Sequence, residues 1–426
     1  MRFTFRLIVM MLPALSAGAQ GKCAHTADWA TDALDKAAGQ VVLTAQKYEN
    51  QENLPCSIRK FYSPTRLEWQ LSESHEGKSL QTFMKEKGYT EESRDGYFDE
   101  KMHLCTYGDW RSGFFPGSLW LVHALTGDSE ACRLAKAYTN KLNDIRYLSN
   151  THDLGFMSMC SYGNALKFAP ADSLKPFIIR VADNLCTRFN PVIGCIRSWN
   201  GSKWNYPVII DNMMNLELLF WATKETGDPK YRTIAISHAD RTIANHFRPD
   251  YTSYHVVSYN DDGTVECKNT HQGYHDESSW SRGQSWGLYG FTMCYRETGE
   301  KRYLEQAEHI ASTVMERVTT EDRIPYWDYD AVRDDETPRD ASAAAVTASA
   351  LLELASLTGN KTYYNYAESI LKSLSGSEYL ASPGTNCGFV IKHATTTLPT
   401  ASEVDASLNY ADYYYLEALY RYLNFQ

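Results

Sequence analysis

The chain has 426 residues, and its 52 acidic against 42 basic side chains give a net charge of −10, which argues against a nucleic-acid partner because phosphates require a basic face. A small anionic ligand is still compatible with this charge, since a local pocket can be positive on a negative protein. The 29 Tyr and 10 Trp favour a carbohydrate ligand, because aromatic faces stack on the apolar sides of sugar rings, although large helical cores also contain many aromatic residues.

The N-terminal residues have the pattern of a cleaved secretory signal peptide. Arg2 and Arg6 form a short basic start, residues 7–15 are mostly apolar, and small residues follow at 17–19. The apolar stretch is too short to cross a bilayer, and no later stretch reaches the roughly 20 uninterrupted apolar residues that a membrane helix needs. We therefore expect residues 1–19 to be removed, and the mature protein to be exported to the periplasm without insertion into a membrane.

The remaining residues, 20–426, contain no Pro/Gly/Ser-rich linker, so the sequence predicts a single domain. We expect this domain to be a monomer or a weak oligomer. Its ten cysteines are scattered without a CxxC motif or a Cys/His metal spacing. Most of them are therefore predicted to be buried apolar side chains, and the sequence does not determine any disulfide pairing.

A helix-loop-helix unit recurs along the chain, and its loop contains the dipeptide Thr-Gly. The glycine follows a helical stretch and suits the left-handed conformation that ends a helix, and it occurs at Gly127, Gly227, Gly299 and Gly359. A fifth unit is predicted across residues 154–188, with Ala171 in the place of the glycine. Such units bury their apolar faces by stacking on one another, which indicates a helical repeat architecture.

The two helices of each unit differ in their apolar pattern. The helix after the loop is apolar on one face, as in residues 301–318, which predicts an outer layer. The helix before the loop has small and apolar residues on most faces, as in residues 342–356, which predicts an inner ring. A sixth hairpin is expected from the N-terminal segment or from residues 411–423. The sequence thus predicts an all-α fold, an (α/α)6 toroid, with an open solenoid as the alternative.

A charged residue stands at a similar distance before each loop, near the start of each inner helix. In a closed ring of parallel inner helices, these starts meet at one end. Asp is also favoured as a helix N-cap, so capping is a competing explanation for the aspartates in this set. The set comprises Asp109, Asp153, Asp211, Arg282 and Asp340.

Residues 269–286 combine stacking faces, hydrogen-bond donors and a cation, a mixture that suits sugar recognition. His271 and His275 are four residues apart, but Gly273 lies between them and HExxH is absent, which disfavours a zinc site. No G-x-S-x-G elbow and no glycine-rich phosphate loop is present. The sequence therefore predicts neither a metal ion nor a cofactor.

Asp211 is flanked by apolar residues on both sides, in YPVIIDNMMNLELLFW. Apolar surroundings disfavour the charged form of a carboxyl group and raise its pKa, as a general acid that works near neutrality requires. The alternative is a buried cap bonded to backbone amides, which would lower the pKa instead.

From about Cys105 to the C-terminus, the chain resembles glycoside hydrolase family 88, the unsaturated glucuronyl hydrolases. The resemblance rests on motifs such as DWRSGFFPGSLW, HDLGFM, IIDNMMNLELLFWA, THQG and SWSRGQSWGLYGF, whereas residues 21–102 match less well. It implies an (α/α)6 fold and a metal-free hydrolysis, with Asp211 as general acid/base and Asp153 as second carboxylate. It also implies a sugar subsite lined by Trp110, His152, His255, His271, Gln272, Trp280, Arg282 and Trp286.

The implied substrate is an anionic di- or oligosaccharide that ends in an unsaturated uronic acid, a product of polysaccharide lyases. Its C4=C5 double bond is an enol ether, and Asp211 is expected to protonate it while Arg282 binds the uronate. Asp109 and Asp340 are expected to be structural. The sequence does not specify the glycan. Lys392, His393 and residues 402–405 are expected either to border the next sugar and any sulfate group or to form a solvated C-terminal loop.

Three other functions fit parts of the pattern. An unsaturated rhamnogalacturonyl hydrolase of family 105 would use the same chemistry on pectin fragments. A conventional inverting glycosidase would place a water molecule between two carboxylates. A glycan-binding toroid would use its carboxylates only as helix caps.

Overall fold

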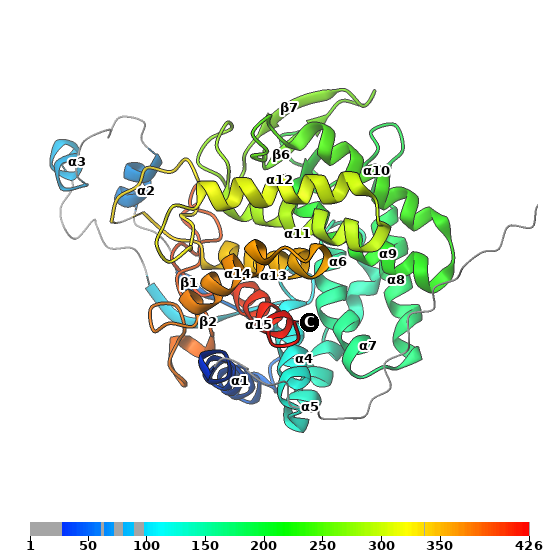
Figure 1. Cartoon of the computed structure of the whole chain (residues 1–426), viewed down its shortest axis with the longest axis horizontal. Coiled ribbons are helices and arrows are strands. Elements are labelled where there is room, and N and C mark those ends of the chain that lie inside the picture. Colours follow the sequence, from blue (N-terminus) through cyan, green and yellow to red (C-terminus); the bar gives the residue numbers. More distant parts are fainter. Residues whose placement is uncertain (1–27, 61–63, 72–79, 89–97, 336, 426) are drawn as a thin grey trace, which may run out of the picture.

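The structure, a computed structural model, describes residues 28–60, 64–71, 80–88, 98–335 and 337–425. The predicted signal peptide at residues 1–19 lies outside the described residues. Inner helices of the described chain form a ring in which each contacts the next, and α15 closes the ring against α4 (Figure 1). They are α4 (Phe114–Thr126), α6 (Leu154–Ser158) continued by η3 (Met159–Gly163) and α7 (Asn164–Phe168), α9 (Leu216–Thr226), α11 (Ser281–Thr298), α13 (Ala341–Thr358) and α15 (Asn409–Leu423).

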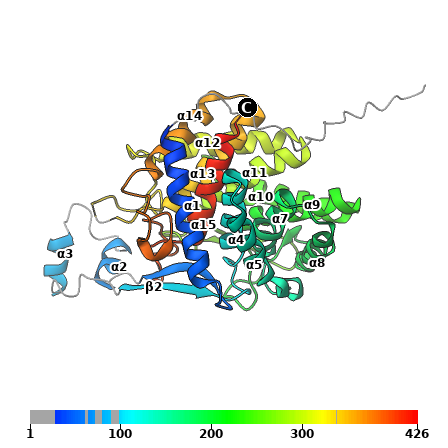
Figure 2. The ribbon, with the colours of Figure 1, turned by 90° about the horizontal axis from the view of Figure 1, so that it is seen from below.

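An outer helix packs against each inner element and completes its hairpin. The outer helices are α1 (Asp28–Tyr48), α5 (Ser129–Asn140), α8 (Lys175–Cys186), α10 (Pro229–His246), α12 (Lys301–Arg317) and α14 (Lys361–Leu374). This arrangement confirms the predicted (α/α)6 toroid. The sixth hairpin uses both candidate segments, because α1 from the N-terminus covers α15 from the C-terminus, and the two lie side by side in Figure 2.

The Thr-Gly loops end the inner helices as predicted. Gly127, Gly227, Gly299 and Gly359 adopt left-handed φ angles of 72°, 73°, 70° and 71°. The predicted equivalence of Ala171 is wrong, since its φ of −146° is extended. The helix before it, α7, ends at Phe168, and a 3-10 turn, η4 (Asp172–Leu174), leads into α8, because a residue with a Cβ atom avoids the left-handed conformation.

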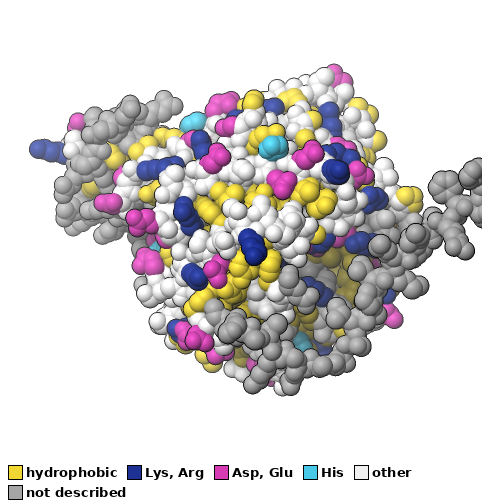
Figure 3. Space-filling view, in the orientation of Figure 1, with side chains coloured by type: hydrophobic (Ala, Val, Ile, Leu, Met, Phe, Trp, Pro, Cys, Tyr) yellow, Lys and Arg dark blue, Asp and Glu magenta, His cyan; other side chains and the backbone are white. Residues whose placement is uncertain are grey.

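The inner helix α13 is long and apolar enough to cross a membrane, but in the toroid it is a core helix with most of its side chains buried. Its sequence of small residues allows neighbouring inner helices to approach it closely. The face of the molecule in Figure 3 mixes basic and acidic side chains without a large patch of one sign.

Short strands that the sequence did not predict connect the helices. The sheets pair β1 (Leu54–Lys60) with β2 (Phe98–Cys105), β3 (Phe189–Asn190) with β4 (Cys195–Ile196), and β5 (Pro207–Ile209) with β6 (Val256–Tyr259) and β7 (Val265–Asn269). The other short elements are α2 (Pro64–Leu71), α3 (Leu80–Lys87), η2 (Asn143–Tyr147), η5 (Ile210–Asn215) and η6 (Asn386–Gly388). The three-stranded sheet matters most for function, because its strands lead directly into the candidate site.

Candidate active site

A pocket with about 440 Å³ of empty space, part of it open to solvent, lies at the end of the ring where the inner helices begin. Seven of the ten predicted site residues line it: Trp110, His152, Asp153, Asp211, Gln272, Trp280 and Arg282. The predicted convergence of side chains that are far apart in the sequence therefore occurs, and it includes both carboxylates, Asp153 and Asp211.

Asp211 lies in η5, directly after strand β5, and its side chain is almost completely buried at the pocket edge. Its Oδ2 atom has no hydrogen-bond partner among the described residues. Burial raises the pKa of Asp211 from 3.8 to about 7, and the negative charge of Asp153 adds to the rise, while Arg282 acts in the opposite direction. A carboxyl with this pKa can donate a proton near neutral pH and then accept one.

The three-stranded sheet places His255 behind Asp211. The Ile210 backbone N–H donates to the carbonyl of His255 (3.1 Å) at the junction of β5 and β6. After β7, the backbone N–H groups of His271 and Gln272 donate to His255 Nδ1 (3.1 and 3.2 Å). Because Nδ1 accepts, the ring hydrogen is on Nε2, which lies 3.7 Å from Asp211 Oδ2. Burial lowers the pKa of His255 well below its usual value, so the ring is neutral.

Asp153 stands at the N-terminus of α6 but makes no side-chain cap. Its Oδ2 accepts a hydrogen bond from Thr151 Oγ1 (3.0 Å), and its Oδ1 lies 3.2 Å from His152 Nε2. His152 Nδ1 lies 2.9 Å from the Ser198 carbonyl oxygen, which can only accept, so Nδ1 must carry its hydrogen. Nε2 of a neutral His152 then has no hydrogen, and a carboxylate oxygen of Asp153 has none either. A hydrogen bond between the two side chains therefore forms only when one of them binds a further proton.

Arg282 is buried and bonded within the protein. Its Nη1 donates to Asp340 Oδ2 (2.6 Å) and to the Thr395 carbonyl, and its Nη2 donates to the Thr396 carbonyl (2.6 Å). Its Nε–H has no acceptor among the described residues. The side chain thus supplies positive charge to the pocket, while most of its donors are already used.

Capping explains one of the predicted aspartates and not the two in the pocket. Asp340 caps α13, where its side chain accepts from the backbone N–H groups of Ser342 (3.0 Å) and Ala343 (3.4 Å). Neither Asp153 nor Asp211 makes such a bond to its helix start.

Three of the predicted subsite residues do not line the pocket. Trp286 is completely buried below it, against the rings of Phe156 and Tyr414 at centroid distances of 5.2 and 5.3 Å. It lies one helical turn after Arg282 on α11, which places it deeper in the ring. His255 is buried behind Asp211, and His271 is exposed, 5.1 Å from the ring of Trp199.

Three lining residues were not predicted: Trp199, Ile209 and Thr396. Trp199 stacks on Trp204 at 5.6 Å, and this Trp pair in the motif SWNGSKW is a signal that could have indicated a sugar platform. Ile209 ends strand β5, which the sequence did not predict. Thr396 lies in a loop between α14 and α15 that carries no comparable signal.

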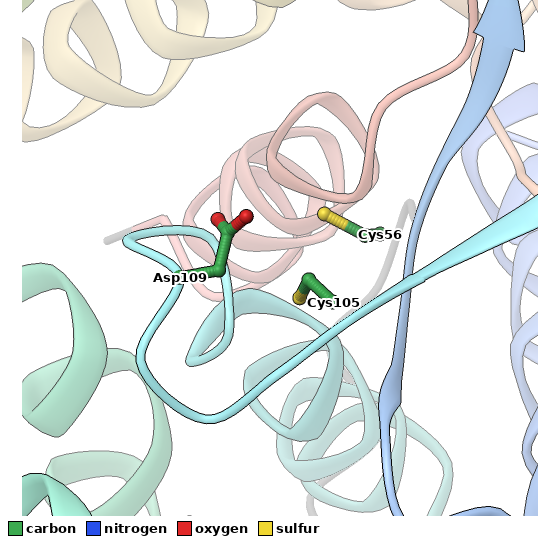
Figure 4. A group of neighbouring side chains, drawn as sticks. All are labelled: Cys56, Cys105 and Asp109. Carbon is green, nitrogen blue, oxygen red and sulfur yellow. The ribbon is translucent and has the colours of Figure 1, made fainter.

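One other cluster could be considered for a metal ion. Potential ligand atoms of Cys56, Cys105 and Asp109 lie within 4.8 Å of one another (Figure 4). Both carboxylate oxygens of Asp109 already accept hydrogen bonds from Arg111 (3.0 and 2.9 Å). A guanidinium at this position repels a cation, so these residues form a poor metal site.

Comparisons with known proteins find glycoside hydrolases that resemble this chain. A family model described as Glycosyl hydrolase family 47 matches residues 283–422, less than half of the chain. An unsaturated glucuronyl hydrolase from Formosa agariphila is 46% identical over 330 residues, which cover 76% of this chain and 82% of that relative. An unsaturated chondroitin disaccharide hydrolase from Streptococcus agalactiae is 31% identical over 330 residues, which cover 74% of this chain and 81% of that relative.

A solved structure of an unsaturated glucuronyl hydrolase specific for heparin superposes with a TM-score of 0.81 at 44% identity, covering 93% of this chain and 97% of that one. Both the fold and the sequence therefore point to the same group of enzymes. The chain belongs to the unsaturated glucuronyl hydrolases, and it is a glycosidase that releases unsaturated uronic acid from oligosaccharides.

Proposed function

We propose that this enzyme, as a member of glycoside hydrolase family 88, hydrates the C4=C5 double bond of an unsaturated uronic acid at the end of a lyase-generated glycosaminoglycan disaccharide. The observation that carries the proposal is Asp211, a buried carboxyl with a pKa raised to about 7 that faces a pocket shared with Asp153. Its ability to exist in both protonation states near neutral pH suits a group that first gives and then takes a proton.

In the proposed reaction, the protonated Asp211 delivers its proton to C4 of the enol ether. Positive charge then develops at C5, where the ring oxygen shares it, and water adds to C5 while its proton passes to the Asp211 carboxylate. The resulting hemiketal opens and releases the neighbouring sugar. The carboxyl group thus returns to its starting state, so one residue acts as general acid and general base.

The other pocket residues are assigned supporting roles. The charge of Asp153 raises the pKa of Asp211 and keeps a proton on it at the start of the reaction. The guanidinium of Arg282 supplies positive charge that complements the uronate. Trp110, Trp199 and Trp280 provide the aromatic faces against which sugar rings pack.

A panel of unsaturated disaccharides from chondroitin, hyaluronan and heparin, sulfated and unsulfated, tests the proposal. Hydration removes the ultraviolet absorbance of the enol ether, so this absorbance should fall as sugar is released. A saturated disaccharide with the same linkage is the matched control and should not be cleaved. Release of sugar from the control, with the absorbance of the unsaturated substrates retained, would instead indicate a conventional glycosidase.

A further inference from the structure

The loop that contributes Thr396 to the pocket is a tight hairpin, residues 393–406, which we call the wall hairpin. Isolated bridges pair Ala394 with Ala406 and Thr397 with Ser402 across it. Its backbone holds two pocket residues, because the Thr396 carbonyl accepts from Arg282 Nη2 (2.6 Å). The same carbonyl accepts from Gln272 Nε2 (2.9 Å). The hairpin therefore helps to position both side chains, and for Arg282 it acts together with Asp340.

The wall hairpin has a strained backbone. Four of its residues, none of them glycine, have left-handed φ angles: His393 (61°), Ala401 (53°), Glu403 (51°) and Asp405 (50°). This conformation is unfavourable for residues with a Cβ atom and persists only where the surroundings hold it in place. The hairpin must therefore be fixed by contacts from outside its own backbone.

Glu403 makes the contacts that can fix it. Its carboxylate is buried and accepts hydrogen bonds from Arg111 Nη1 on both oxygens (2.9 and 3.0 Å). It also accepts from Thr396 Oγ1 (2.9 Å) within the hairpin and from Ser57 Oγ on strand β1. Arg111 is itself held by Asp109, whose carboxylate is shown in Figure 4.

These contacts link the start of α4 to the pocket through buried charges. We propose that Glu403 is a positioning residue for the reaction: its ion pair with Arg111 holds the strained wall hairpin, which in turn orients Arg282 and Gln272 toward the substrate. The inference rests on the proposed function and adds to it a residue outside the pocket. Glu403 itself touches no reacting atom and acts through Thr396.

Glu403→Gln tests the proposal, because it keeps the shape of the side chain and removes the charge that pairs with Arg111. The KM for the unsaturated disaccharide should rise on the order of tenfold, with a smaller change in kcat, since the residues that orient the substrate lose their support. The alkaline limb of the kcat/KM profile should also move to higher pH. The positive charge of Arg282 lowers the pKa of Asp211, so this pKa should rise when Arg282 moves away from the carboxyl group.

Glu378→Gln is the matched control. The Glu378 side chain is exposed and lies 3.6 Å from His393 Nε2, at the other end of the wall hairpin, so it should leave KM and the pH profile unchanged. Arg111→Lys should shift KM in the same direction as Glu403→Gln, because an ammonium group cannot bridge two carboxylates with the geometry of a guanidinium. The double variant should then cost less than the sum of the two single changes.

A binding measurement separates this inference from the proposed function. In the Asp211→Asn background, Glu403→Gln should weaken the calorimetric Kd for the same disaccharide on the order of tenfold, whether or not the wild type turns it over. A folded Glu403→Gln protein with a lower Tm but unchanged KM, Kd and pH profile would show a merely structural role and overturn the inference. If the wild type is inactive but Glu403→Gln still weakens binding in the Asp211→Asn background, only the proposed function is contradicted.

Discussion

Asp211→Asn removes a buried charge and the proposed proton donor in one step, so its effects on stability and on activity should have opposite signs. Asp211 is 7% exposed, and burial together with the charge of Asp153 raises its pKa from 3.8 to about 7. Between these two values, the folded state binds more protons than the unfolded state. Stability is therefore lost as the pH rises through this window, and the loss is complete above the folded pKa.

The shift from 3.8 to about 7 is about 3 pKa units. At about 1.4 kcal/mol per unit, the raised pKa costs the folded state about 4 kcal/mol at pH 8, where the carboxyl is ionised in both states, and about 2 kcal/mol at pH 5, where folding requires the carboxyl to bind a proton. An amide carries no charge and avoids this cost. Asp211→Asn should therefore raise the free energy of unfolding by more at pH 8 than at pH 5, while turnover falls by about 10²- to 10⁴-fold or more.

Urea unfolding at pH 5 and pH 8, together with turnover of an unsaturated disaccharide, measures both effects. Asp412→Asn is the control, since Asp412 is also buried with a pKa raised to about 7. Its carboxylate accepts from the backbone N–H groups of Val390 (3.0 Å) and Ile391 (2.8 Å), and an amide leaves one of these N–H groups without an acceptor. Asp412→Asn should therefore show a similar pH dependence, but a smaller gain in the free energy of unfolding than Asp211→Asn at each pH. The reasoning about Asp211 is refuted if wild type and Asp211→Asn show the same pH dependence of stability, or if the variant keeps normal turnover.

Three further changes have defined outcomes. Asp153→Asn removes a charge that raises the pKa of Asp211, so the alkaline limb of the kcat/KM profile should move to lower pH; an unshifted limb would contradict the coupling. Gly155→Ala adds a Cβ atom 2.4 Å from the Asn215 Cα atom, so α6 and η5 must separate. The Tm should fall by several degrees and the activity should also decrease; a normal Tm and normal activity would contradict this packing. Arg282→Ala leaves the buried carboxylate of Asp340, which caps α13, without its counter-charge. The free energy of unfolding in urea titrations should fall by about 3–5 kcal/mol and KM should rise; unchanged stability would show that the fold does not need the Arg282–Asp340 ion pair.

Local patterns in the sequence were sufficient for the fold class. The one-faced pattern of residues 301–318 and the small, apolar pattern of residues 342–356 distinguish outer from inner helices, because burial on one face or on most faces requires different compositions. The glycines of the Thr-Gly loops mark helix ends, because the left-handed conformation favours a residue without a Cβ atom. The failure at Ala171 follows from the same rule, since a residue with a Cβ atom took an extended conformation instead.

The position of Asp211 in the site also followed from local information. Apolar residues on both sides of it predict burial and a raised pKa, and the structure gives a pKa of about 7. Asp211 and Asp153 stand at similar distances before their loops, which predicts that the two side chains share one end of the ring, and both line the pocket.

The depth of each side chain depended on the tertiary structure. Trp286 and Trp280 belong to the same motif, but only Trp280 reaches the pocket, because the turn of α11 carries Trp286 into the ring. His255 stands behind Asp211 because three short strands pair there, and strands of three to five residues are too short to show a clear periodicity.

The sequence by itself thus determined the helical repeat, the helix ends at the four Thr-Gly loops and the burial of Asp211, since each depends on residues within a few turns of one another. Only the tertiary structure decided that α1 covers α15 and that Thr396 and Glu403 support Arg282. Those contacts join segments that are far apart along the chain, and they form only when the ring closes. Local periodicity does not predict how the ring closes, because it specifies which face of a helix is buried and not which partner helix packs against that face.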